Sequence, residues 1–249
     1  MQIIDIWNKF DLYWPKVILV VIFGFSGITS DAQSRYEQKP FVRKNNPNYD
    51  DRKISYGFLI GLHTAALQIR YSDQFVTPAF DTVYAVHPTR TAGFKLGFIV
   101  NFRAEEFLDF RLTPNVSFYE HQVDYIYTNQ QKNTQLVETT MVEFPFLAKY
   151  KSARRGNIRM YMIGGISPGI EASGKKDLES SVSSLELDRF NLSLEAGFGF
   201  DLYYPLFKFS PELRFSRGIR DMLGNRSNIY GQPLKSVTMN TVTIYLLFQ

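Results

Sequence analysis

The chain has 249 residues, of which 45% are hydrophobic, 16% aromatic and 21% charged, with a formal net charge of +4. This length is enough for one large domain or two small ones, and the apolar fraction argues against wholesale disorder. The absence of cysteine excludes disulfide frameworks, thiolate metal sites, cysteine nucleophiles and a lipid-modified N-terminal cysteine. The net charge is too small and too evenly spread to indicate a nucleic-acid partner.

The N-terminus has the layout of a signal peptide. Lys9 and Lys16 precede an apolar run over 17–25, and small residues follow it. The run is too short for a helix that spans a bilayer, which needs ~20 residues, but it fits the hydrophobic region of a secretory signal. The alternative is a buried helix in a cytosolic protein. We predict a cleavable signal peptide over 1–32 and a polar, periplasmic N-terminal lead over 33–53.

From residue 54 onwards, apolar and polar residues alternate with a period of two, which predicts β-strands. The pattern predicts eight strands: 54–69, 94–103, 108–118, 137–150, 158–172, 190–203, 206–217 and 237–248. Between them, short connections alternate with four long polar ones, 72–90, 121–136, 174–187 and 218–236. A meander with short turns at one end and long loops at the other is typical of an outer-membrane β-barrel.

The alternation alone does not show which face of the strands contacts water. A soluble eight-stranded barrel turns its apolar face inward around a ligand, whereas a membrane barrel turns it outward to lipid. Glycines fall mostly on the charged parity, as expected for a crowded lumen. Four tyrosines lie near predicted strand ends, where interfacial girdles occur: Tyr150, Tyr203, Tyr204 and Tyr245. We predict an all-β fold, an eight-stranded antiparallel up-and-down outer-membrane β-barrel over 54–249.

This orientation places the charged parity inside the barrel. An eight-stranded lumen is only wide enough to be filled by side chains, and buried charges cost several kcal/mol each unless they are paired. Seven basic and six acidic residues nearly cancel, so we predict a filled polar lumen rather than a conducting path. The lumen charge network comprises Lys95, Arg103, Asp109, Arg111, Glu143, Lys149, Arg159, Glu171, Glu195, Asp201, Lys208, Glu212 and Arg214.

The basic stretch 149–159 falls at a predicted short turn. We interpret it as a charge belt against anionic lipid headgroups. The alternative is a docking patch for a periplasmic partner.

Catalytic chemistry would have to use the histidines, His63, His87 and His121. None has the spacing of a metal motif, and the chain contains no Gly-x-Ser-x-Gly. Conceivable carboxylate partners are Glu143 or Asp109 for His63, and Asp81 or Asp124 for the other two. We predict a protein that is not an enzyme and has no catalytic residues, cofactor or metal site. The alternatives are a barrel enzyme that modifies lipid or peptide, and a small adhesion or binding barrel.

Several segments resemble the PorT/SprT family: 53–63, 93–98, 107–114, 142–151, 160–165 and, above all, 204–215 with its Lys-Phe-Ser-Pro-Glu-Leu block. The residues that match the family's blocks are Glu143, Pro145, Lys208, Ser210, Pro211, Glu212 and Arg214. The resemblance covers nearly all of 53–249. It implies an outer-membrane barrel of the type IX secretion and gliding-motility machinery, with a structural or assembly role. Its expected partners are outer-membrane lipid and other type IX secretion proteins, with no nucleic acid and no small-molecule substrate.

Overall fold

The computed structural model describes residues 45–76, 83–128, 131–172, 185, 187–225 and 230–249. The chain divides into two units, 1–41 and 42–249, and every described residue belongs to the second. The predicted signal peptide and most of the predicted lead therefore lie outside the described residues.

The second unit is built from strands, in agreement with the alternating pattern. They are β1 (Ile54–Tyr71), β2 (Val83–Thr89), β3 (Thr91–Arg103), β4 (Leu108–Leu112), β5 (Asn115–Tyr127), β6 (Lys132–Glu143), β7 (Phe146–Lys151), β8 (Ile158–Glu171), β9 (Phe190–Tyr203), β10 (Lys208–Gly218) and β11 (Leu234–Phe248). Two short 3₁₀ turns accompany them, η1 (Tyr49–Asp51) and η2 (Asp73–Val76). In the part of the chain that the structure describes, no helix is long and apolar enough to cross a membrane.

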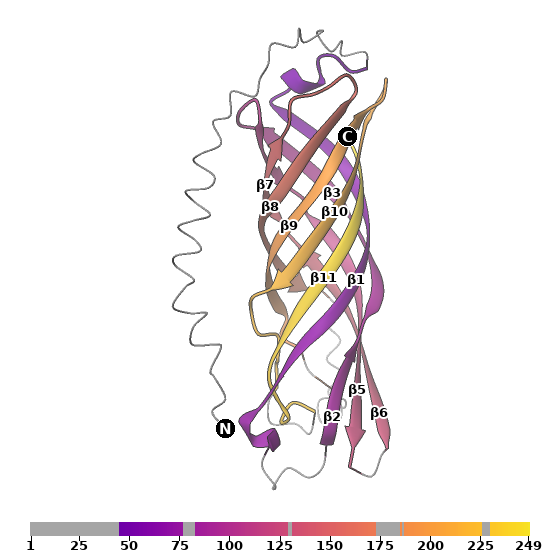
Figure 1. Cartoon of the computed structure of the whole chain (residues 1–249), viewed down its shortest axis with the longest axis vertical. Coiled ribbons are helices and arrows are strands. Elements are labelled where there is room, and N and C mark those ends of the chain that lie inside the picture. Colours follow the sequence, from indigo (N-terminus) through magenta and orange to yellow (C-terminus); the bar gives the residue numbers. More distant parts are fainter. Residues whose placement is uncertain (1–44, 77–82, 129–130, 173–184, 186, 226–229) are drawn as a thin grey trace, which may run out of the picture. The chain divides into compact units, whose positions relative to one another are not determined.

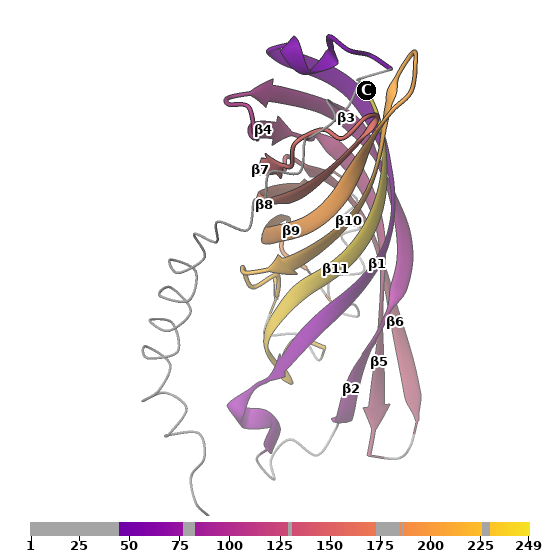
Figure 2. The same cartoon turned by 45° about the horizontal axis from the view of Figure 1, so that its top comes forward.

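The strands close into a ring of eight. β4 and β5 together form one wall strand, because both pair with β3, and β6 and β7 form the next, because both pair with β8. The ring continues through β8, β9, β10 and β11, and β11 pairs with β1 in antiparallel register from Phe58–Phe248 to Tyr71–Leu234. Figures 1 and 2 show the tilt of these strands around the cylinder. The predicted eight-stranded antiparallel barrel is confirmed.

Prolines explain why two wall strands are interrupted. Pro114 separates β4 from β5, and Pro145 separates β6 from β7; neither can donate a backbone hydrogen bond. The ladder nevertheless continues across both breaks. The carbonyl of Pro114 accepts a bond from the amide of Phe98 (2.9 Å), and that of Pro145 accepts one from Thr113 (3.1 Å). The interruptions are therefore local irregularities in continuous strands.

The strands reach further into two predicted loops than the sequence suggested. β2 lies inside the predicted loop 72–90 and pairs with β5 from Val83–Tyr127 to Thr89–Gln122. β5 and β6 stay paired as far as Ile126–Lys132, inside the predicted loop 121–136. In Figure 1, β2, β5 and β6 form a ribbon that continues beyond the end of β10. The loop prediction was wrong here because the parity reverses in β5, where polar residues such as Glu120 are exposed and apolar residues such as Val123 and Tyr125 are buried.

The outer face of the barrel carries a wide apolar belt. On β1, Tyr56 is 67% and Leu62 is 62% exposed, and large apolar side chains point outward on the other wall strands as well. Surface of this kind requires lipid or a partner, since soluble monomers rarely expose large contiguous apolar patches. Two of the tyrosines predicted for the interfacial girdles, Tyr203 and Tyr245, instead point inward and are buried. That part of the prediction was wrong because their parity places them on the lumen side.

The interior has two regions of opposite chemistry. The charged region lies towards the end with the short turns, here called the short-turn end, and contains Asp50, Lys95, Asp109, Arg111, Glu143, Lys149, Lys151, Arg154, Arg159, Glu195, Asp201, Lys208, Glu212 and Arg214. The apolar region lies towards the opposite, long-loop end and contains Ala65, Leu67, Val83, Val86, Tyr119, Val123, Tyr125, Met141, Leu185, Met222, Leu223, Tyr230, Leu234, Val237 and Met239. The predicted polar filling therefore describes only the charged region. In the apolar region the inward parity itself becomes apolar, as at Val123 and Tyr125 of β5.

Candidate functional site

The short-turn end is closed by the end of the predicted lead. Asp50, in η1, accepts hydrogen bonds from Arg159 (3.1 Å), Arg154 (3.3 Å) and the hydroxyl of Tyr203 (3.0 Å). Arg103 donates to the backbone carbonyl of Asp50. Burial raises the pKa of the Asp50 carboxyl, but the charge of Arg159, the Tyr203 hydrogen bond and Arg154 outweigh it and hold the pKa below its usual value. The described end of the lead, at η1, is thus fixed to the barrel by an ionised carboxylate.

The next layer is centred on Asp201 of β9. Its carboxylate accepts bonds from Lys149 (2.7 Å) and Ser210 (2.7 Å), and Lys208 lies 3.9 Å away. The ammonium of Lys149 also lies 3.7 Å from the centroid of the Tyr161 ring, a cation–π geometry. This layer joins four strands, β7, β8, β9 and β10, through one carboxylate and its neighbours.

Glu212 of β10 lies at the centre of the charged region. One of its oxygens accepts bonds from Arg111 (2.7 Å) and from the hydroxyl of Tyr161 (2.7 Å). The other accepts two from Arg214, at 2.9 and 2.5 Å. Arg214 also reaches Glu195 of β9 at 2.9 Å. The Glu212 side chain is 0% exposed, so these donors replace the whole of its hydration.

The last charged layer borders the apolar region. Lys95 donates to Glu143 (2.7 Å) and to the hydroxyl of Tyr119 (2.7 Å), and Tyr119 donates to the other oxygen of Glu143 (2.6 Å). The three side chains come from β3, β5 and β6 and form a closed triangle. Tyr119 also belongs to the apolar region, so the same residue joins the two fillings.

The histidines do not assemble a catalytic group. His63 and His121 are both buried and lie close to the Tyr119 ring, with ring centroids 4.5 and 5.6 Å from it. Neither Nδ1 nor Nε2 of His63 has a hydrogen-bond partner in the described chain. His87 is exposed on β2, opposite Asp124 in the strand register. The prediction that His121 lies in a loop was wrong, because β5 extends past it. Asp81 lies outside the described residues.

The structure brings eleven of the thirteen predicted network residues together in ion pairs inside the barrel. Arg103 and Glu171 are placed differently. Arg103 is half-buried and bonds a backbone carbonyl, and Glu171 is half-buried at the end of β8, opposite Met141 of β6. Among the described residues, no group of histidine, aspartate and glutamate has the geometry to hold a metal ion.

The basic stretch at the short turn faces inward, so its interpretation as a headgroup belt was wrong. Lys149 and Lys151 are buried against Asp201 and Asp109, at 2.7 and 2.5 Å. Arg154 and Arg159 bind Asp50, and Arg155 is the one basic residue of the stretch that is exposed. The lumen charge network predicted from strand parity already includes Lys149 and Arg159, and the same parity could have placed Lys151 on the lumen side. Nothing in the alternation could have shown that Asp50 and Arg154, outside the strands, complete the network.

Comparison with known proteins agrees with this architecture. The family described as outer membrane protein beta-barrel domain matches residues 32–224. The chain belongs to this family. It is an outer-membrane β-barrel protein, so the apolar belt faces the hydrocarbon of that membrane and the long loops face the outside. A comparison with curated proteins finds no match.

Solved structures of small barrels are similar to this outer-membrane barrel. Neisserial surface protein A is 10% identical, with a TM-score of 0.43, and the match covers 79% of this chain and 98% of that one. OprG from Pseudomonas aeruginosa is 14% identical, with a TM-score of 0.43, and the match covers 78% of this chain and 93% of that one. The attachment invasion locus protein Ail of Yersinia pestis is 13% identical, with a TM-score of 0.33, and the match covers 79% and 99%.

Proposed function

We propose that this barrel is a non-enzymatic structural or assembly component of the type IX secretion and gliding-motility machinery. The observation that carries the proposal is the occupied interior, in which ion pairs and an apolar cluster follow one another from η1 to the long-loop end. A barrel with a filled interior can function through its outer surface and its loops, as a scaffold protein does. The resemblance of segments in 53–249 to the PorT/SprT family adds the identity of the machinery.

The residues of the most specific resembling block support a structural role. Lys208, Ser210, Glu212 and Arg214 are buried and contact Asp201, Glu195 and one another. Residues held in this way stabilise the barrel and are not accessible to a substrate. The proposed partners are therefore outer-membrane lipid and other type IX secretion proteins, which would contact the outer wall, the ends or the loops.

Deletion of the gene, followed by assay of extracellular enzymes, tests the proposal. We expect those enzymes to stay inside the cell and to be secreted again when the full-length gene is restored. Unchanged secretion in the deletion strain would refute the proposal.

A second measurement tests the filled interior. Purified protein in planar bilayers should show no stable ohmic conductance, and reproducible channel currents would contradict the filled interior.

One feature favours adhesion or partner binding as a second candidate. The ribbon of β2, β5 and β6 continues beyond the end of β10 on the outer side (Figure 1), where a partner could contact it. Shortening the ribbon, together with the long loops, should then abolish binding and spare export.

The enzyme alternative instead requires loss of activity when His63, His87 and His121 are each replaced.

A further inference from the structure

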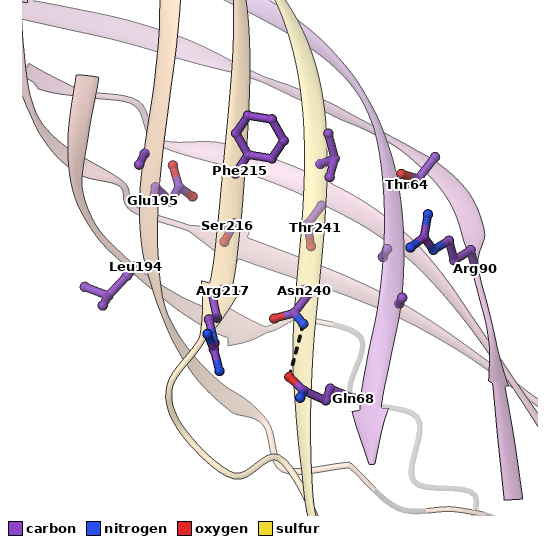
Figure 3. A pocket seen from close by; sticks show the side chains of 14 residues that line it. Thr64, Gln68, Arg90, Leu194, Glu195, Phe215, Ser216, Arg217, Asn240 and Thr241 are labelled. Atoms are coloured by element: carbon purple, nitrogen blue, oxygen red, sulfur yellow. Dashed lines mark hydrogen bonds between the residues drawn. The ribbon is translucent and has the colours of Figure 1, made fainter. Parts of the chain in front are cut away.

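A groove of about 630 Å³ lies on the outer wall of the barrel near the long-loop end (Figure 3). It crosses β9, β10, β11 and β1 and is bounded by Arg90, between β2 and β3. An adjoining hollow of about 510 Å³ shares Gln68 and Arg217 with it and adds Arg70. The wall is hollowed here because small side chains, such as Ala66 and Ala196, point outward and leave space above the strands.

The groove changes from apolar to basic along the membrane normal. Phe215 lies between Ala196 and Val242 in the strand register. Two residues further towards the long loops, Arg217 lies between Leu194 and Asn240, and Asn240 donates a hydrogen bond to Gln68 (3.2 Å). The hydrocarbon side of the groove thus offers an aromatic ring, and the water side offers a guanidinium and two amides. A lipid in the membrane has the same arrangement, with its apolar chains towards the hydrocarbon and its polar headgroup towards water.

The arginines around this groove are not neutralised. Arg70, Arg90 and Arg217 are exposed, and none of them has an ion pair in the described chain. The acidic residues that line the two hollows are already engaged. Glu195 points inward to Arg214 at 2.9 Å, and Asp221 accepts bonds from the backbone amides of Leu223 (3.0 Å) and Val237 (2.8 Å). The site therefore presents positive charge to whatever occupies it.

We propose that this groove binds a phosphorylated glycolipid of the outer leaflet. Its phosphate groups would lie at Arg217 and Arg90, and an acyl chain would lie along Phe215. The long loops face the cell exterior, so the groove is at the headgroup level of that leaflet. Arginine is suited to phosphate because its planar guanidinium donates two parallel hydrogen bonds. The two arginines are separated by three inter-strand steps, roughly 14 Å at ~4.8 Å per step, which leaves room for a sugar headgroup between them.

Native mass spectrometry of the full-length protein in detergent tests the proposal with bisphosphorylated lipid A and its enzymatically dephosphorylated form. Arg90→Gln and Arg217→Gln should each weaken binding of the phosphorylated lipid by roughly fivefold, and the double variant by roughly thirtyfold. The dephosphorylated lipid should bind as weakly to wild type as the phosphorylated lipid binds to the double variant. Unchanged affinity in the double variant, or equal affinity for the two lipids, would overturn the proposal.

Two controls separate specific binding of the lipid from non-specific charge attraction and from binding of free phosphate. Arg155→Gln removes an exposed arginine at the opposite, short-turn end and should leave affinity unchanged; an equal loss there would indicate non-specific charge attraction and overturn the site. Inorganic phosphate in large excess should not displace the lipid, whereas full displacement would show a free-anion site and contradict the glycolipid. Since neither Arg90 nor Arg217 has an ion-pair partner among the residues that the structure describes, the double variant should unfold at the wild-type temperature. This inference does not depend on the secretion role.

Discussion

The charged and apolar regions of the barrel interior fill the same cylinder by different means. In the charged region, most ions are matched to a partner on another strand, as Arg111 of β4 is matched to Glu212 of β10. In the apolar region, residues from the connections complete the filling, among them Met222 and Tyr230. Ion pairs need defined partners, whereas apolar contacts tolerate repacking if volume is kept. The charged region therefore fixes strand positions, and the apolar region closes the lumen towards the outside.

The difference predicts how each region responds to mutation. Removing one member of a buried ion pair leaves its partner charged and unpaired, a cost that repacking cannot relieve. Removing part of a buried apolar side chain leaves a cavity that neighbours can partly fill. The residues of the charged region lie mostly on wall strands that are held by their ladders on both sides, so the backbone cannot shift to relieve an unpaired charge.

Glu212→Gln has the largest expected effect and tests whether the ion pairs of the charged region stabilise the barrel. It leaves Arg111 and Arg214 without their shared carboxylate, and we expect the free energy of unfolding to fall by about 3–5 kcal/mol. Urea unfolding in lipid vesicles measures the change. Glu120→Gln is the matched control because Glu120 is exposed on the outer face of β5, and it should change stability by less than about 0.5 kcal/mol. Equal effects of the two substitutions would show that the buried network adds no stability.

The apolar region is tested by Leu234→Ala. Leu234 is 2% exposed at the start of β11, and truncation should cost about 2–4 kcal/mol through lost burial and a cavity. Leu136→Ala is the control, because Leu136 is 54% exposed on β6 and should be nearly neutral. Unfolding curves for both variants check the difference. A cost for Leu234→Ala well above that of Glu212→Gln would reverse the ranking of the two regions.

The alternating pattern was enough to predict the barrel and most of the charged region, because strand parity alone places residues such as Lys149 and Glu212 inside. It could not predict the layer made by Asp50 and Arg154, which lie outside the strands. It also missed the apolar region. There the inward parity becomes apolar at Val123 and Tyr125 while exposed residues such as Glu120 are polar, so the two faces exchange the character that they have in the charged region. The groove near Arg217 depends on the register between β9, β10, β11 and β1, which alternation alone does not give.

Neighbouring glycines in β8 sharpen the comparison between the inner and outer faces of the charged region. A Cβ on Gly165 would clash with the carbonyl oxygen of Phe146, whereas a Cβ on Gly164 would have its nearest neighbour at 3.6 Å, the carbonyl oxygen of Glu195. Gly165→Ala should therefore cost about 1–3 kcal/mol by forcing backbone shifts, and Gly164→Ala should cost less than about 1 kcal/mol. Thermal unfolding of the two variants in the same detergent measures the gap. Similar costs would show that the inner face can accommodate a methyl group at Gly165 without backbone shifts.

The smallest expected effect concerns the outer edge of the charged region, where Asp50 joins the lead to the barrel. Its pKa is lower in the folded protein than in the unfolded chain, so its contribution is fully present above the unfolded value of about 3.9 and is lost as the pH falls through the folded value. Asp50→Asn should lower the unfolding midpoint at pH 7, and the gap from wild type should shrink below about pH 4. Asp51→Asn, at an exposed neighbour, should show no such gap. A gap that persists unchanged at low pH would mean that shape and hydrogen bonding, rather than charge, hold the lead in place.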